Sequence, residues 1–131
     1  MKLTIDTSAL IAVILNEPEK PSILKITEGT QLLSPESVHW EIGNAFSAMI
    51  KRERILLQLA QRGIKEYQRI PIRFINVDLF STMELIEEFQ MYAYDAYLIK
   101  CSLQTNTPLL TLDKGLIRIA KTVGINVLEV K

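Results

Sequence analysis

The stretch LTIDTSALIAVIL, residues 3–15, places a single carboxylate between two apolar segments. Leu3–Ile5 is typical of a short strand, and Thr7 and Ser8 are typical caps for a helix over the second apolar segment. A strand followed at once by a helix is the first half of a βα unit. Asp6 stands at the junction, and a buried carboxylate must be hydrogen-bonded, neutralised or bound to a cation.

The composition indicates an ordinary folded protein. The 131 residues are enough for one domain with a hydrophobic core, and 48% of them are apolar, which is too many for a disordered chain. Fifteen basic and fifteen acidic residues cancel, which argues against a binder held to nucleic acid by overall charge. A site that holds a phosphodiester through metal ions stays open, because the metal supplies the positive charge.

Features tied to cellular location predict a soluble cytoplasmic protein without membrane association. Cys101 is the only cysteine, so no internal disulfide can form and nothing suggests an oxidising compartment. The apolar run Ala9–Leu15 is far too short to span a bilayer. Asp6 precedes that run, where a secretory signal would carry basic residues.

Short apolar segments alternate with longer periodic ones along the chain, which is typical of βα units. Strands are expected at 3–5, 31–33, 74–77, 109–112 and 126–128. Helices are expected at 7–15, 21–28, from residue 37 onward, and at 56–69, 79–89, 94–103 and 116–121. The helix at 94–103 is apolar nearly all round and should be central. We therefore predict a single domain over residues 1–131 with an α/β fold, a three-layer α/β/α sandwich with a mostly parallel, about five-stranded sheet.

Two aspartates directly follow predicted strands. Asp6 follows Leu3–Ile5, and Asp113 follows the apolar run Leu109–Leu112. In an open parallel sheet, ligands bind beyond the carboxyl ends of the strands, so both aspartates stand at the end where a site forms. Thr111 should point to the same side as Asp113 if the strand continues. Each aspartate, taken alone, is equally well explained as a helix N-cap.

Two further carboxylates lie on apolar helices. Glu41 falls roughly 80° from the apolar stripe that begins at Val38, and Asn44 shares its side of the helix. Asp95 is the only charge in MYAYDAYLI, residues 91–99, and leaving it unpaired there would be costly. The alternatives are that Glu41 is an ordinary solvated residue and that Asp95 pairs with Lys100 or an arginine.

Taken together, these four candidate acids suggest one carboxylate cluster: Asp6, Glu41, Asp95 and Asp113. Like charges gathered in one crevice repel and raise one another's pKa, and a divalent cation removes that conflict. Oxygen ligands suit Mg²⁺ or Mn²⁺. Because His39 and Cys101 are the only residues of their types, a zinc site is not expected.

Four motifs in this order resemble those of the PIN-domain nucleases: IDTSAL (5–10), WEIGNAF (40–46), YDAYLI (94–99) and TLDKGL (111–116). They are most similar to the VapC-like toxins of prokaryotic toxin–antitoxin pairs, and the resemblance extends from residue 3 to about residue 130. It implies an α/β/α fold and a metal-dependent ribonuclease that hydrolyses RNA phosphodiester bonds with Mg²⁺ or Mn²⁺. Carried over by motif, the four candidate acids are its catalytic and metal-binding residues.

The resemblance also implies supporting residues and partners. Polar positions that support such a site are matched by Ser8, Asn44, Thr7 and Thr111. Lys100 and Lys114 are candidates for contacting substrate phosphates. Similar toxins form homodimers and hold an antitoxin in a groove, and the helices between Pro18 and Arg69 are rich in the Leu, Ile and Met that such contacts need.

Two other classes stay open. One is a non-catalytic binding module that keeps the fold, and the other is a Mg²⁺-binding receiver-type or phosphoryl-transfer domain. The receiver class needs a mid-chain strand that ends in an acceptor aspartate, and Asp78 follows the third predicted strand in this way. It also needs paired acids after the first strand, and this sequence has none there. Trp40 is expected to pack in the core or an interface. The tyrosines Tyr92, Tyr94 and Tyr97 are expected in the core, with base stacking as the alternative.

Overall fold

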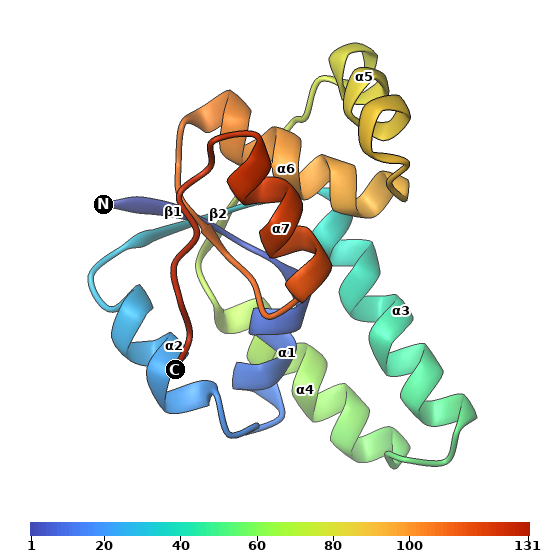
Figure 1. Ribbon diagram of the computed structural model, residues 1–131. Coiled ribbons are helices and arrows are strands. Elements are labelled where there is room, and N and C mark those ends of the chain that lie inside the picture. The colour runs from blue at the N-terminus through green and yellow to red at the C-terminus, as the bar shows by residue number, and fades with distance from the viewer.

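The computed structural model describes residues 1–131 and contains a four-stranded parallel sheet with seven helices (Figure 1). The strands are β1 (Lys2–Ile5), β2 (Gln31–Pro35), β3 (Ile72–Ile75) and β4 (Leu109–Leu110). The helices are α1 (Thr7–Ile14), α2 (Lys20–Thr27), α3 (Ser37–Lys51), α4 (Leu57–Arg69), α5 (Leu79–Phe89), α6 (Ala93–Thr105) and α7 (Lys114–Thr122). The predicted α/β class is confirmed.

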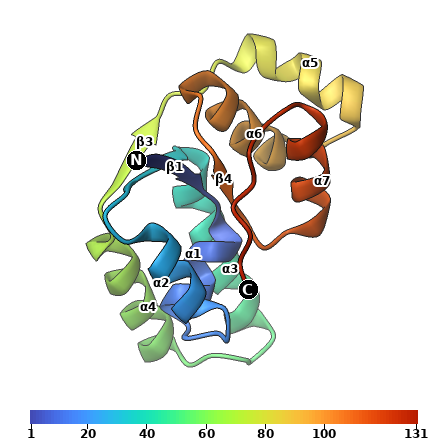
Figure 2. The ribbon, with the colours of Figure 1, turned by 60° about the vertical axis from the view of Figure 1, so that its left-hand side comes forward.

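The strand order is β3-β2-β1-β4, which places β1 at the centre of the sheet beside β4. The chain runs outward from β1 to β2 and β3, and then returns to pair β4 with the other side of β1. The topological switch point therefore lies between β1 and β4, which is where ligands bind in open α/β sheets. Right-handed crossovers leave α1, α2 and α4 on one face of the sheet and α6 and α7 on the other (Figure 2).

The sheet has four strands, one fewer than the expected number of about five. The C-terminal segment pairs with β4 only where Leu109 meets Val127, in parallel. The Leu109 N–H donates to Asn126 O and the Leu128 N–H donates to Leu109 O, each at 2.9 Å. Because β4 is only two residues long, it offers this segment no longer edge to pair with. The predicted strand at 74–77 was also misplaced, since β3 begins two residues earlier, directly after a proline.

Strand β1 is buried on both of its faces. Leu3, Thr4 and Ile5 are all buried, as expected for a central parallel strand covered on both sides. The predicted central position of α6 is confirmed, because it packs against β1, β2, α3, α5 and α7. Cys101 on this helix is fully buried with its Sγ 3.7 Å from Thr4 Oγ1, and burial raises its pKa to about 11. None of the seven helices is both long enough and apolar enough to cross a bilayer.

Three aromatic residues lie at the surface: Trp40, which was expected in the core or an interface, and Tyr92 and Tyr94, which were expected in the core. Trp40 is 66% exposed, because it lies roughly 160° around α3 from the buried stripe centred on Ile42. Tyr92 is 85% exposed, because it precedes α6 as its N-cap residue and so escapes the packing of that helix. Tyr94 is also exposed, and only Tyr97 is partly buried.

The contact between α3 and α4 depends on a glycine and yields a stability prediction. A Cβ added at Gly63 on α4 would lie 2.6 Å from Phe46 Cζ, in the core, and 3.3 Å from Ile14 Cγ2. Gly63→Val should therefore lower the free energy of unfolding by about 1–3 kcal/mol. Gly43→Ala on α3, where a Cβ meets nothing within 4 Å, should be neutral or stabilising by up to about 1 kcal/mol. Urea unfolding followed by circular dichroism tests both, and equal stability of the two variants would contradict this packing.

Candidate functional site

Asp6 is almost completely buried at the end of β1, with only 4% of its surface exposed. It is the N-cap of α1: its Oδ1 accepts from the Ala9 N–H at 3.1 Å and from Ser8 Oγ at 2.8 Å. Its other oxygen, Oδ2, accepts a short hydrogen bond from Thr111 Oγ1. The capping interpretation is therefore correct for Asp6, but it accounts for only one of the two carboxylate oxygens.

A hydroxyl network ties the end of β1 to the loop after β4. The Asp113 N–H donates to Thr111 Oγ1 at 3.0 Å, and Thr111 in turn donates to Asp6. Ser8 Oγ accepts from the Leu112 N–H at 3.0 Å while it donates to Asp6. Thr111 is buried and Ser8 is partly buried, so both hydroxyls hold the carboxylate in one orientation.

Asp113 stands beside this network at the start of α7. Its Oδ1 accepts from the Leu116 N–H at 3.0 Å, so it caps that helix as Asp6 caps α1. No other hydrogen bond from the protein reaches its side chain, which is exposed. Two neighbouring parallel strands are thus each followed by a helix-capping aspartate, and both aspartates lie at the switch point of the sheet.

Glu41 reaches the same region from α3. It is partly buried, which contradicts the interpretation as an ordinary solvated residue, and its Oε2 accepts from Thr7 Oγ1 at 3.2 Å. Thr7, one of the predicted supporting residues, therefore connects α1 to α3. Asn44, another of them, is exposed and makes no hydrogen bond within the chain.

Asp95 lies in the first turn of α6 and is partly buried, with no hydrogen bond and no ion pair. The only ion pair in the chain joins Arg69 to Glu66 at 3.6 Å, so the alternative that Asp95 pairs with Lys100 or an arginine is wrong. Lys100 follows Asp95 by five residues, roughly 140° around the helix. Its charge acts on Asp78, whose pKa is lowered mainly by hydrogen bonds from Ser81 and to a smaller extent by Lys100.

Burial and mutual repulsion raise the pKa of three of the four candidate acids. Burial, together with a smaller effect of the Asp113 charge, raises the pKa of Asp6 to about 6 in spite of three hydrogen bonds that lower it. Burial raises the pKa of Glu41 to about 7, and the charges of Asp6 and Asp95 add to this effect. Burial, with the charge of Asp113, also raises the pKa of Asp95. The four carboxylates thus form one electrostatic cluster without a basic partner.

The donor set suits a hard divalent cation, because carboxylate oxygens are its only ionisable groups. No three of the acidic, histidine or cysteine side chains approach closely enough to ligate one ion together. Mg²⁺ does not need three, since it is commonly held by one or two carboxylates and completes its coordination with water and substrate phosphates. The residues present therefore fit such an ion.

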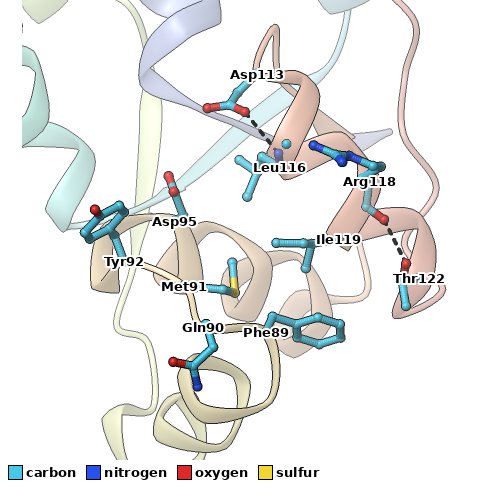
Figure 3. A pocket seen from close by; sticks show the side chains of 11 residues that line it. Phe89, Gln90, Met91, Tyr92, Asp95, Asp113, Leu116, Arg118, Ile119 and Thr122 are labelled. Carbon is cyan, nitrogen blue, oxygen red and sulfur yellow. Dashed lines mark hydrogen bonds between the residues drawn. The ribbon is translucent and has the colours of Figure 1, made fainter.

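A pocket of about 460 Å³ opens beside the cluster, between α7 and the junction of α5 with α6 (Figure 3). Asp95 and Asp113 line it together with Tyr92 and Arg118. The sequence analysis did not single out Arg118. The sequence signal that could have identified it is a basic residue between Leu116 and Ile119, on the helix that Asp113 caps.

The receiver-type alternative finds no support in the position of Asp78. This aspartate is exposed at the far end of the sheet, beyond the edge strand β3, where it caps α5 by accepting from the Ser81 N–H at 3.2 Å. It is separated from the acidic cluster at the switch point by the width of β2 and β1.

Comparisons with known proteins agree with this geometry. The sequence profile of the PIN domain matches residues 3–122, so the chain belongs to the PIN domain family. No protein of curated function matches the chain significantly in sequence. The resemblance predicted from the four motifs is therefore confirmed at the level of the family.

Solved structures share the fold at low sequence identity. PAE2754 from Pyrobaculum aerophilum superposes with a TM-score of 0.72 and 20% identity, covering 94% of this chain and 86% of that one. VapBC2 from Rickettsia felis, bound to a DNA fragment from their promoter, superposes with a TM-score of 0.69 and 17% identity, covering 98% of each chain. VapBC-1 from nontypeable Haemophilus influenzae superposes with a TM-score of 0.68 and 13% identity, again covering 98% of each chain.

The buried carboxylates predict an unusual pH dependence of stability for the metal-free protein. Because the folded state holds protons on Asp6 up to about pH 6 and on Glu41 up to about pH 7, stability should fall as the pH rises from about 4 to about 7. Asp6→Asn keeps an acceptor for the α1 cap and removes the buried charge. The free energy of unfolding of Asp6→Asn, relative to that of wild type, should rise by on the order of 1–3 kcal/mol as the pH is raised from 4 to 7.5.

Urea unfolding in EDTA at the two pH values measures this difference. Glu87→Gln on the exposed face of α5 is the matched control and should follow wild type at both values. A constant difference between Asp6→Asn and wild type across the range would show that the Asp6 carboxylate is not held in an unfavourable environment.

Proposed function

We propose that this PIN-domain protein is a Mg²⁺- or Mn²⁺-dependent ribonuclease that hydrolyses RNA phosphodiester bonds. The observation that carries the proposal is the cluster of four carboxylates at the switch point of the sheet, which has no basic partner and in which burial raises the pKa of Asp6, Glu41 and Asp95. A buried charge of this kind costs stability, so its presence is better explained by a ligand than by folding.

In this proposal the four candidate acids have two kinds of role at the cation site. Asp6 and Asp95 are the central ligands of the cation, and Glu41 and Asp113 complete or orient the site. The bound cation supplies positive charge against the phosphodiester and lowers the pKa of water. Asp6 is suited to its role because hydrogen bonds from Ser8, Ala9 and Thr111 hold both of its oxygens in place before any ligand binds.

The remaining polar residues act on the substrate and on protons. Glu41, partly buried and held by the hydrogen bond from Thr7 Oγ1, is placed to accept a proton from an attacking water. Lys114 is exposed beside Asp113 and is the better placed of the two candidate lysines for a substrate phosphate. The charge of Lys100 instead interacts with that of Asp78, which lies away from the acidic cluster.

We further propose that the protein is the toxin of a toxin–antitoxin pair and acts in the cytoplasm. Its motifs resemble VapC-like toxins, and its fold is shared with two VapBC structures. A groove of about 420 Å³ between α3 and α4 offers an apolar surface for an antitoxin, lined in part by Phe46, Ile50, Leu57 and Ile64. Ile50 and Leu57 in this groove are exposed, and neighbouring exposed apolar side chains are typical of an interaction site.

Cleavage of RNA by the purified chain tests the enzymatic proposal. Wild type should cleave RNA with Mg²⁺ or Mn²⁺ and lose this activity in EDTA. Asp6→Asn and Asp95→Asn should each lower kcat by at least about 100-fold, because each removes a ligand of the cation. The matched control Glu87→Gln should cleave as wild type does.

Titration calorimetry separates an enzyme from a binding module that only shares the fold. Wild type should bind Mn²⁺ in the calorimeter, and Asp95→Asn should weaken that binding. A wild-type chain that neither binds Mn²⁺ nor cleaves RNA would contradict the proposal and favour the non-catalytic module.

The proposed homodimer has its own test. Helix α5 carries an exposed apolar patch of Leu79, Phe80 and Met83, in addition to the apolar helices between residues 18 and 69. Light scattering of wild type at micromolar concentration should give twice the chain mass of 14.9 kDa. If α5 forms the contact, Phe80→Glu should shift the protein toward monomer and Glu87→Gln should not; a wild-type monomer would contradict the proposed dimer.

A further inference from the structure

The pocket beside the acidic cluster is not explained by metal binding alone. Asp95 and Asp113 line one end of it, and the rest of the wall extends away from them along α7 (Figure 3). Its volume of about 460 Å³ lies within the range of sites that hold a small ligand. The pocket is therefore a candidate binding site continuous with the proposed catalytic one.

The walls of the pocket differ in character along their length. Apolar side chains from the α5–α6 junction and from α7 form its floor: Phe89, Met91, Leu116 and Ile119. The ring of Tyr92 stands at the rim with 85% of its surface exposed, on the side of Asp95 (Figure 3). Such an exposed ring over an apolar floor offers one flat face to a planar ligand.

Arg118 contributes a positive charge that nothing in the chain neutralises. It lines the pocket from α7, is exposed, and makes no ion pair. Its guanidinium points toward the end of α7 where Asp113 lies (Figure 3). A planar guanidinium in this position can bind a phosphate through two hydrogen bonds.

Gly115 keeps the space between the acid and the guanidinium open. A Cβ built there would lie 3.3 Å from Asp113 Oδ1 and 3.9 Å from Arg118 Nη2. The two charged groups thus approach the same point from either side without pairing. A ligand that enters here meets acidic oxygens on one side and a cation on the other.

We propose that this pocket holds one nucleotide of a single-stranded RNA substrate, next to the phosphate that is cleaved. The base lies on the apolar floor and stacks on Tyr92, and the phosphate of the same nucleotide binds Arg118. The inference rests on the proposed ribonuclease function and adds the subsite that positions the strand. A single strand is required, because only an unstacked base can turn into such a pocket.

Nucleic acid suits the pocket better than a protein side chain does. The combination of an aromatic face, a guanidinium and an apolar floor matches the base and phosphate of one nucleotide. A basic peptide would be repelled by Arg118, and an acidic side chain has no planar ring to stack on Tyr92. The pocket thus offers Asp95 and Asp113 to a cation and Arg118 to the phosphate of a nucleotide that lies beside that cation.

Cleavage kinetics on a short single-stranded RNA oligonucleotide with Mn²⁺ test this inference. Tyr92→Ala should lower kcat/KM by about 5- to 100-fold through loss of stacking, and Tyr92→Phe should restore most of it. Arg118→Gln should raise KM more than it lowers kcat. It should also reduce the slope of log(kcat/KM) against log salt by about 0.7, the value for one lost phosphate contact on a single strand. Lys121→Gln, on the same helix but outside the pocket, is the matched control.

The outcomes separate this inference from the proposed function. If wild type cleaves RNA and the Tyr92 and Arg118 variants match it in kcat/KM, the subsite is wrong while the ribonuclease stands. If wild type cleaves no RNA with Mg²⁺ or Mn²⁺, the proposed function fails and the subsite fails with it. If the variants change self-association in light scattering and leave cleavage unchanged, the pocket is a protein contact, which also overturns the inference.

Discussion

The buried carboxylate of Asp6 is the constraint on which the rest of the site depends. One of its oxygens caps α1 and the other accepts from Thr111 beyond β4, so a single side chain joins the central strand, the first helix and the neighbouring strand. These bonds favour the charged form, but burial outweighs them and raises the pKa to about 6. The fold therefore holds Asp6 in place at a cost in stability that no basic side chain offsets.

Topology explains how distant parts of the sequence reach this point. The return of the chain from β3 to β4 creates a switch point beside β1, and both strands there are followed by a helix-capping aspartate. Helices α3 and α6 pack against each other and bring Glu41 and Asp95 to the same end of the sheet. The proposed site thus combines two aspartates that cap helices, Asp6 and Asp113, with two acids that cap none, Glu41 and Asp95.

Sequence patterns predicted much of this arrangement. The apolar run before Asp6 marked the correct end of β1, the run before Asp113 located β4 but extended it two residues too far, and helical periodicity located all seven helices. The lone charge at Asp95 in an apolar helix was an equally direct signal. Local chemistry carries such information, because a cap or a buried charge depends on residues close in the chain.

What the sequence did not predict depends on tertiary contacts. Periodicity did not show that β4 is too short to pair a fifth strand, or that no other element covers Trp40. Tyr92 and Arg118 come to line the same pocket only when α7 packs against α6. Their place in the pocket depends on two segments far apart in the sequence, and no local pattern encodes it.

The anomalous diffraction of a crystal grown with Mn²⁺ tests the central claim most directly, because it locates the ion without assuming an activity. The account predicts the strongest anomalous peak at the end of β1, within coordination distance of the carboxylates of Asp6 and Asp95. A map without a peak there, or a lysine or arginine side chain in that position, would contradict it.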